Sequence, residues 1–315
     1  MFDFHTHFIP EDVINWIDDN KTAINATRIE KNPKKEKFLS INEKWAFELK
    51  QDFINADLYM KKQQEAAISH SIISPVPQLF LYDFDSDITK EIATVYNNAL
   101  VSWQRENPEQ LSGLATVSLN HPEQAAKDLR DGMNKGLKGA IIGPGVHGKT
   151  LSDPFFTPFW EEAQHLKAII FIHPLLSEDP RLHHHMMPNL VGVPWETTIA
   201  ATDILLSGML DTYDQVKILL AHGGGFFPYQ IGRLNQGYHQ WPHVAENLRK
   251  EPSAYVSDFW YDTVLMHPET HRYLNNTAGS DKLVSGSDFP FDLCSWPPLQ
   301  TSETAAHSLL YTEGT

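Results

Sequence analysis

Short apolar runs recur along almost the whole chain, and amphipathic segments of helical length lie between them. Most runs, such as AIIFI and VKILLA, are continuous rather than alternating, which is typical of strands buried on both faces of a parallel sheet. The strand candidates are Phe2–Phe8, Ser69–Val76, Leu111–Leu119, Lys138–Ile142, Ala168–His173, Val216–Ala221, Ala254–Asp262 and Lys282–Ser287. Eight strands that alternate with helices predict an α/β fold closed into a (β/α)8 TIM barrel.

The chain length agrees with a single barrel domain. A barrel alone needs about 250 residues, so the 315 residues present fit one domain over 1–315 that carries an insertion. The lysine-rich, polar segment from about 20 to 48 interrupts the alternation directly after the first strand. Loops that follow barrel strands lie on the catalytic face, so this insertion is either a lid over the site or a solvated loop.

Charge and cysteine content exclude several classes of protein. The chain has 40 Asp and Glu against 25 Lys and Arg, a formal net charge of −15. Such a surface repels phosphate backbones and anionic lipids, so we expect no nucleic-acid partner and no membrane partner. The only cysteine is Cys294, which allows no intrachain disulfide and fits a reducing compartment. With neither a basic leader nor a long apolar stretch, the sequence predicts a cytoplasmic protein.

Histidines and one aspartate stand at the ends of predicted strands. His5 and His7 lie two residues apart on the first strand, which places both imidazoles on the same face. His173 ends the fifth strand, His222 ends the sixth, and Asp288 follows the eighth. Each alone is more often a structural or turn residue than a ligand. Because the carboxyl ends of barrel strands converge on one mouth, however, the set predicts a site for a divalent metal ion.

The motifs that carry these residues resemble the amidohydrolase-2 group of the amidohydrolase superfamily. They are HTHF on the first strand, HP after the fifth, HGGG after the sixth and GSDFP after the eighth, supported by MPNLVGVPWETTIA and HGGGFFPYQIGR. The resemblance implies that His5, His7, His173 and Asp288 bind one metal ion, zinc or else manganese. It also implies that His222 acts as the base on a metal-bound water, with Asp288 taking part in catalysis.

The same resemblance implies substrate contacts and a partner. Arg233 matches a family arginine that reaches the site of a neighbouring subunit and binds substrate carboxylate, which implies a homodimer. As an isolated residue, Arg233 would be read as a helix-surface ion pair. The chain departs from the family at two places: the insertion stretch KFLSINEKW offers lysines where a second arginine is expected, and His185 stands where the family has an active-site tryptophan. No lysine ends the fourth strand to bridge two metals, so we expect a single ion.

These residues favour a metal-dependent, non-oxidative decarboxylase of an unsaturated or aromatic carboxylic acid, a small-molecule substrate. The alternative on the same site is hydrolysis of an ester, lactone or amide, and a metal-binding barrel without activity stays possible. The segment 143–150 also matches the phosphate-binding pattern GxxxxGK[ST]. That pattern needs a helix to begin at its lysine, and Pro154 follows too soon, so we interpret this segment as a barrel-mouth loop.

Overall fold

Eight parallel strands form the centre of the molecule. The structure, a computed structural model, describes residues 1–31, 36–44 and 46–311. Within these ranges, the strands of the barrel occur as a three-stranded and a five-stranded parallel sheet. They are β1 (Phe2–His7), β5 (His70–Ser74), β6 (Leu111–Gly113), β7 (Gly139–Ile142), β10 (Ile169–Ile172), β11 (Lys217–Leu220), β12 (Trp260–Asp262) and β13 (Leu283–Val284).

Two junctions close these sheets into a barrel. A parallel bridge between Ala115 and Ala140 joins β6 to β7. On the other side, the backbone amide of Phe4 donates to the carbonyl of Ser285 at 2.8 Å, which joins β1 to the end of β13. The predicted (β/α)8 fold is therefore confirmed, with each strand close to its predicted position. The seventh is the exception, because Pro252–Asp258 forms a 3-10 helix and only the last three residues of the predicted run are extended.

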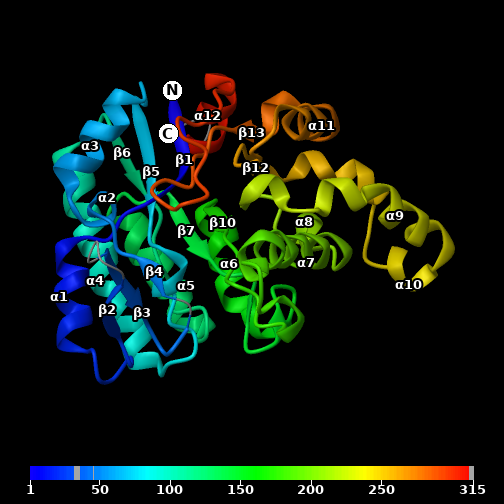
Figure 1. Cartoon of the computed structure of the whole chain (residues 1–315). Coiled ribbons are helices and arrows are strands. Elements are labelled where there is room, and N and C mark those ends of the chain that lie inside the picture. Colours follow the sequence, from blue (N-terminus) through cyan, green and yellow to red (C-terminus); the bar gives the residue numbers. More distant parts are fainter. Residues whose placement is uncertain (32–35, 45, 312–315) are drawn as a thin grey trace.

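Helices surround the strands (Figure 1). They are α1 (Glu11–Asp19), α2 (Gln51–Ile54), α3 (Ala56–Glu65), α4 (Ser86–Glu106), α5 (Pro122–Asn134), α6 (Thr157–Leu166), α7 (Val193–Leu206), α8 (Met209–Thr212), α9 (Phe227–Gln240), α10 (Pro242–Ala245), α11 (Pro268–Ala278) and α12 (Glu303–Leu310). The helices α9 and α10 extend to one side of the barrel. None of the described helices combines the length and the apolar character needed to cross a membrane.

The segment after the first strand carries a small sheet of its own. The strands β2 (Thr27–Lys31), β3 (Glu36–Ser40) and β4 (Phe47–Glu48) pair in antiparallel fashion. They fall within the expected insertion of about 20–48, of which residues 32–35 and 45 lie outside the described residues. Inside it, Leu39 and Phe47 are buried, so the described part packs on the body of the molecule.

The segment that matches a phosphate-binding loop is a hairpin. The short strands β8 (Gly145–Val146) and β9 (Lys149–Thr150) pair with each other, and a 3-10 turn over Pro154–Phe156 leads from them into α6, which begins at Thr157. The ammonium group of Lys149 donates to the carboxylate of Asp153 at 3.0 Å. In the described part of the chain no helix begins at Lys149, as a phosphate-binding loop requires, and this agrees with the position of Pro154.

Candidate metal centre

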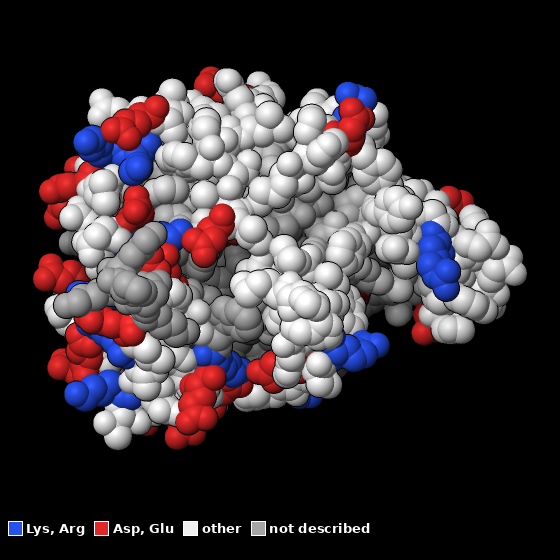
Figure 2. Space-filling model, viewed as in Figure 1, with Lys and Arg blue, Asp and Glu red and all other residues white. Residues whose placement is uncertain are grey.

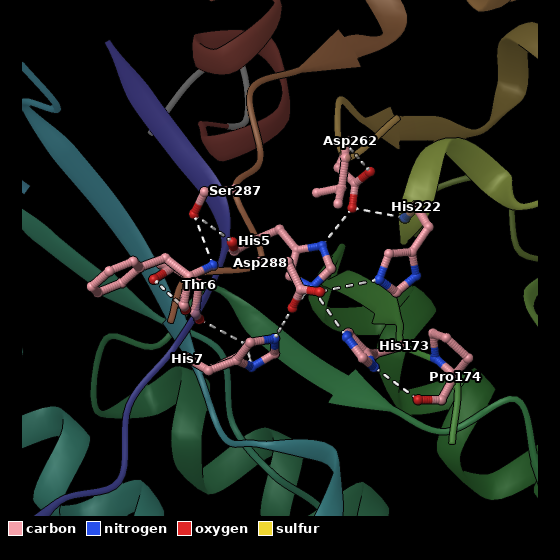
Figure 3. Close-up of polar contacts among 12 residues, drawn as sticks. His5, Thr6, His7, His173, Pro174, His222, Asp262, Ser287 and Asp288 are labelled. Atoms are coloured by element: carbon pink, nitrogen blue, oxygen red, sulfur yellow. Dashed lines mark hydrogen bonds and ion pairs between the residues drawn. The ribbon is translucent and has the colours of Figure 1, made fainter. Parts of the chain in front are cut away.

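Side chains from three strand ends meet at the barrel mouth. His5 and His7 come from β1, His173 follows β10, and Asp288 lies in the loop after β13 (Figure 3). The Oδ1 atom of Asp288 lies 3.1 Å from Nε2 of His5 and 3.2 Å from Nε2 of His7. Nε2 of His173 lies 3.1 Å from Nε2 of His5. Segments separated by almost the whole chain thus bring four side chains together.

Each imidazole of this cluster is fixed at its other nitrogen. Nδ1 of His5 lies 2.6 Å from a carboxylate oxygen of Asp262. Nδ1 of His7 lies 2.9 Å from the carbonyl of Pro75, and Nδ1 of His173 lies 2.9 Å from the carbonyl of Pro174. These oxygens are acceptors only, so each Nδ1 carries a proton and each Nε2 points to the centre, where it offers a lone pair to a metal ion once it has given up any proton of its own.

Burial and charge act strongly on these groups. Burial lowers the pKa of His5, but the negative charge of Asp288 and the hydrogen bond to Asp262 outweigh it and raise this pKa to about 10. Burial and the positive charge of His5 hold the pKa of His173 well below its usual value. Burial raises the pKa of Asp288, but the positive charge of His5 and the hydrogen bond from His222 outweigh it and hold this pKa well below its usual value. The raised pKa of His5 and the lowered pKa of Asp288 have the same cause, because buried carboxylates attract a cation.

His222 stands at the side of the cluster that is open to solvent. Its Nε2 lies 3.5 Å from Oδ2 of Asp288, and the side chains of both residues remain 15% and 11% exposed. Its Nδ1 is buried and has no hydrogen-bond partner among the described residues. The ligating atoms of His5, His173, His222 and Asp288 all lie within 4.8 Å of one another, a set that could hold a metal ion.

The glycines after His222 explain its position. Gly223, Gly224 and Gly225 all have positive φ angles, a region that favours glycine. A Cβ atom at Gly225 would lie 2.1 Å from the carbonyl oxygen of Pro194 on α7. The HGGG sequence therefore lets the chain turn tightly from β11 towards α9 and aims the imidazole of His222 at the mouth.

Two buried carboxylates beneath the cluster were not predicted from the sequence. Asp262 ends β12 and contacts His5 and the backbone of the His222 loop. Asp3 accepts hydrogen bonds from the hydroxyl and the amide of Ser287, next to Asp288. Asp262 carried the same signal as the other site residues, since an acidic side chain ended a predicted strand. Asp3 lies within the first strand and carried no such signal.

The two residues expected to contact substrate lie apart from this network. Arg233 is exposed on α9, and His185 is exposed on the loop after β10, where its ring contacts that of His184. In the part of the chain that the structure describes, neither makes a hydrogen bond or ion pair with the clustered residues. Arg233 makes no ion pair among the described residues. The alternative that it forms an ion pair on the helix surface therefore finds no support within one chain.

Comparison with known proteins places this site in a family. Residues 2–310 match the amidohydrolase family. The chain belongs to that family. A relative from Dictyostelium discoideum, 2-amino-3-carboxymuconate-6-semialdehyde decarboxylase, is 29% identical over 96% of this chain and 85% of its own length. The 6-methylsalicylic acid decarboxylase of Penicillium expansum is 28% identical over 78% of this chain and 75% of its own length. The predicted resemblance is confirmed.

Solved structures show the same fold. IDCase from Metarhizium anisopliae, in its apo form, has a TM-score of 0.81 at 24% identity, and the match covers 98% of this chain and 89% of that chain. The 5-carboxyvanillate decarboxylase of Novosphingobium aromaticivorans, solved with manganese and a nitrobenzoic acid, has a TM-score of 0.79 at 17% identity, with 99% and 93% covered. Both likenesses, which extend over nearly the whole chain, support the barrel fold.

Proposed function

We propose that this chain is a metal-dependent, non-oxidative decarboxylase of an unsaturated or aromatic carboxylic acid. His5, His7, His173 and Asp288 hold one divalent ion, and His222 handles the proton. The observation that carries the proposal is the convergence of three imidazole Nε2 atoms and one carboxylate oxygen at the barrel mouth. The names of the curated relatives support decarboxylation over hydrolysis.

The cluster fits a cation because its inward atoms are all acceptors. Nε2 of His7 and Oδ1 of Asp288 are buried without a hydrogen-bond donor among the described residues. Burying unpartnered polar atoms is costly, and a metal ion removes that cost. Atoms that bind one tetrahedral zinc ion at about 2.0–2.1 Å lie about 3.3 Å apart, close to the 3.1–3.2 Å found here. We propose zinc, with manganese as the alternative because a structural relative was solved with it.

His7 is preferred over His222 as the fourth ligand. Both imidazoles approach Asp288, but Nδ1 of His7 is held by the carbonyl of Pro75, which keeps Nε2 free of a proton. Fixing the ring through its other nitrogen is the usual way in which proteins orient a metal-binding histidine. Nδ1 of His222 has no such partner, so this imidazole can carry its proton on either nitrogen.

The reaction replaces a carbon–carbon bond by a carbon–hydrogen bond. A divalent ion supplies Lewis acidity, and it makes water a better nucleophile at neutral pH. His222 holds a proton between Asp288 and the open mouth, where it can pass to the substrate carbon that bears the carboxylate. The bond to the carboxylate then breaks, its electron pair stays on the carbon skeleton, and CO2 leaves. No oxidant is needed.

A homodimer with Arg233 acting on the neighbouring site completes the proposal. Large apolar side chains are exposed along α7, α9 and α11, among them Ile199, Phe226, Tyr229 and Tyr273. Figure 2 shows few charged groups over this part of the surface. Tyr229 and Arg233 are four residues apart on α9 and therefore share one helix face. An exposed apolar face that carries an unpaired arginine suits an interface between two copies of the chain.

Two smaller assignments belong to the same proposal. His185 lies on the loop after β10, on the side of the barrel where His173 lies, and we propose that it contacts the substrate. The single cysteine, Cys294, is free and half-buried, which favours a reducing, cytoplasmic location.

The test is a substrate screen of purified protein loaded with zinc or with manganese. Aromatic and muconate-type carboxylates are offered and CO2 release is followed, while esters, lactones and amides of similar size are followed by acid release. We expect CO2 from at least one carboxylate and none after chelation. Acid release without CO2 would replace the decarboxylase by a hydrolase on the same site. Turnover of neither set by the loaded enzyme would contradict both activities.

A further inference from the structure

Asp262 is a fully buried carboxylate that touches both halves of the proposed site. It ends β12, between β11, which leads into His222, and β13, which leads towards Asp288. We infer that Asp262 is a positioning residue that fixes the proton of His5 at Nδ1 and holds the backbone that carries His222. The inference rests on the proposed role of His5 as a metal ligand.

All the hydrogen-bond partners of Asp262 are donors (Figure 3). Oδ2 accepts from Nδ1 of His5 at 2.6 Å and from the amide of His222 at 2.9 Å. Oδ1 accepts from the amide of Gly223 at 2.9 Å and from the amide of Val264 at 3.1 Å. A carboxylate offers about four acceptor positions, so each oxygen is fully used.

The arrangement needs a carboxylate rather than an amide. An asparagine at this position would turn its NH2 group towards one pair of donors. If that group faced His5, Nδ1 of the imidazole would have to accept, and the proton would move to Nε2, which points to the other ligands. Loss of the correct tautomer, with the geometry intact, is the known effect of the equivalent change in serine proteases.

The backbone of His222 supplies the second reason. Its φ angle is +54° and that of Gly223 is +60°, in the left-handed region. A residue with a Cβ atom is strained there and stays there only when its surroundings hold it. The two successive amides of His222 and Gly223 point to the same carboxylate. Asp262 therefore joins the orientation of a metal ligand to that of the proposed base.

A purely structural role would make Asp262 the cap of a turn, through Gly223 and Val264 alone. The variant Asp262→Asn separates the two roles, and Asp128→Asn is the matched control. Asp128 is also a buried carboxylate, and it accepts from the amide of Ser118 and the side chain of Gln124, neither of which belongs to the site. Both changes remove one charge and keep the side-chain shape.

Zinc affinity, measured by competition with a chelator, is the first readout. We expect a loss of roughly 10–100-fold for Asp262→Asn, as for other groups that orient a ligand, and near wild-type affinity for Asp128→Asn. The second readout is the nuclear magnetic resonance of the zinc-loaded protein with 15N-labelled histidine. The Nδ1 proton of His5 should resonate far downfield in the wild type and in Asp128→Asn, and should be lost or shifted in Asp262→Asn.

Unchanged zinc affinity together with an unchanged His5 resonance in Asp262→Asn would overturn the inference. If that variant does not fold, the wild-type spectrum still decides, because a His5 that binds zinc through Nδ1 contradicts the proposed tautomer. Neither readout uses turnover. If Asp262→Asn weakens zinc binding and shifts the His5 resonance but the wild type releases no CO2, the role of Asp262 stands and the decarboxylase is rejected. If the wild type releases CO2 but Asp262→Asn changes neither readout, the decarboxylase stands and the role of Asp262 is rejected.

Discussion

The floor of the barrel mouth and its rim differ in how firmly their polar groups are held. On the floor, His5, His7 and His173 are buried, and each ring is oriented by a second hydrogen bond. On the rim, His185 is exposed on the loop after β10, and Arg233 is exposed on the outer helix α9, from which we propose that it reaches the rim of a second subunit. The floor is organised before any ligand arrives, as metal binding and catalysis require. Exposed loops and outer helices are less constrained by packing, and we propose that the rim carries the choice of substrate.

The strongest test of the floor is Asp288→Asn. This change removes the carboxylate whose Oδ1 lies next to two of the imidazoles. We expect zinc affinity to fall by more than the roughly 10–100-fold that follows loss of an orienting group, and decarboxylation to fall with it. Added zinc should also no longer raise the melting temperature, since binding at 100 times Kd stabilises a protein by about 2.7 kcal/mol.

Asp292→Asn is the control for that experiment. Asp292 lies on the same loop, but it is exposed and pairs with Lys50. Zinc affinity and activity should stay near wild type. If Asp288→Asn bound zinc as tightly as its control, Asp288 would not be a ligand.

The boundary between floor and rim is tested by His222→Asn. The variant should lower kcat by about 10²–10⁴-fold, the range for loss of an acid–base group. Because His5, His7 and His173 stay in place, most of the zinc should remain bound. Stopped-flow detection of CO2 and metal analysis of the same sample give both values. The control variant is His243→Asn, because His243 is exposed on α10, and it should change neither kcat nor the zinc content. Full activity of His222→Asn would show that His222 is not the catalytic base.

Arg233→Ala tests whether the rim is completed by a second subunit. We expect KM to rise roughly 10–100-fold, from loss of a charged hydrogen bond. Arg272→Ala on α11, which breaks only a surface pair with Glu269, should leave KM unchanged. Mixing Arg233→Ala with His222→Asn subunits is sharper still. In a twofold dimer with Arg233 acting across the interface, random mixing restores about a quarter of wild-type activity. No restoration would place Arg233 outside the partner's site.

The same contrast explains what could be predicted from the sequence. Barrel strands are continuous apolar runs, and strand ends converge by topology, so the cluster of His5, His7, His173, His222 and Asp288 was predictable. Asp262 could have been predicted by the same argument and was overlooked. Asp3 could not have been predicted, because its role depends on which side chain of the distant loop after β13 it meets. The small sheet β2–β4 also escaped prediction, since its strands are short and polar.

A smaller effect is expected from the link between the insertion and the rim. Lys44 of the insertion lies 2.6 Å from Asp83, in the loop after β5, and 2.9 Å from Glu178, in the loop after β10. All three side chains are exposed to solvent, so the pairs are worth about 0–1 kcal/mol. Lys44→Met should raise KM by at most about fivefold, which corresponds to that energy, and 1 M salt should remove the difference from wild type because it screens such pairs. Lys61→Met, which breaks an exposed pair within α3, is the control and should leave KM unchanged. A salt-independent rise in KM would mean that Lys44 contacts the substrate itself, and the rim would then be held as specifically as the floor.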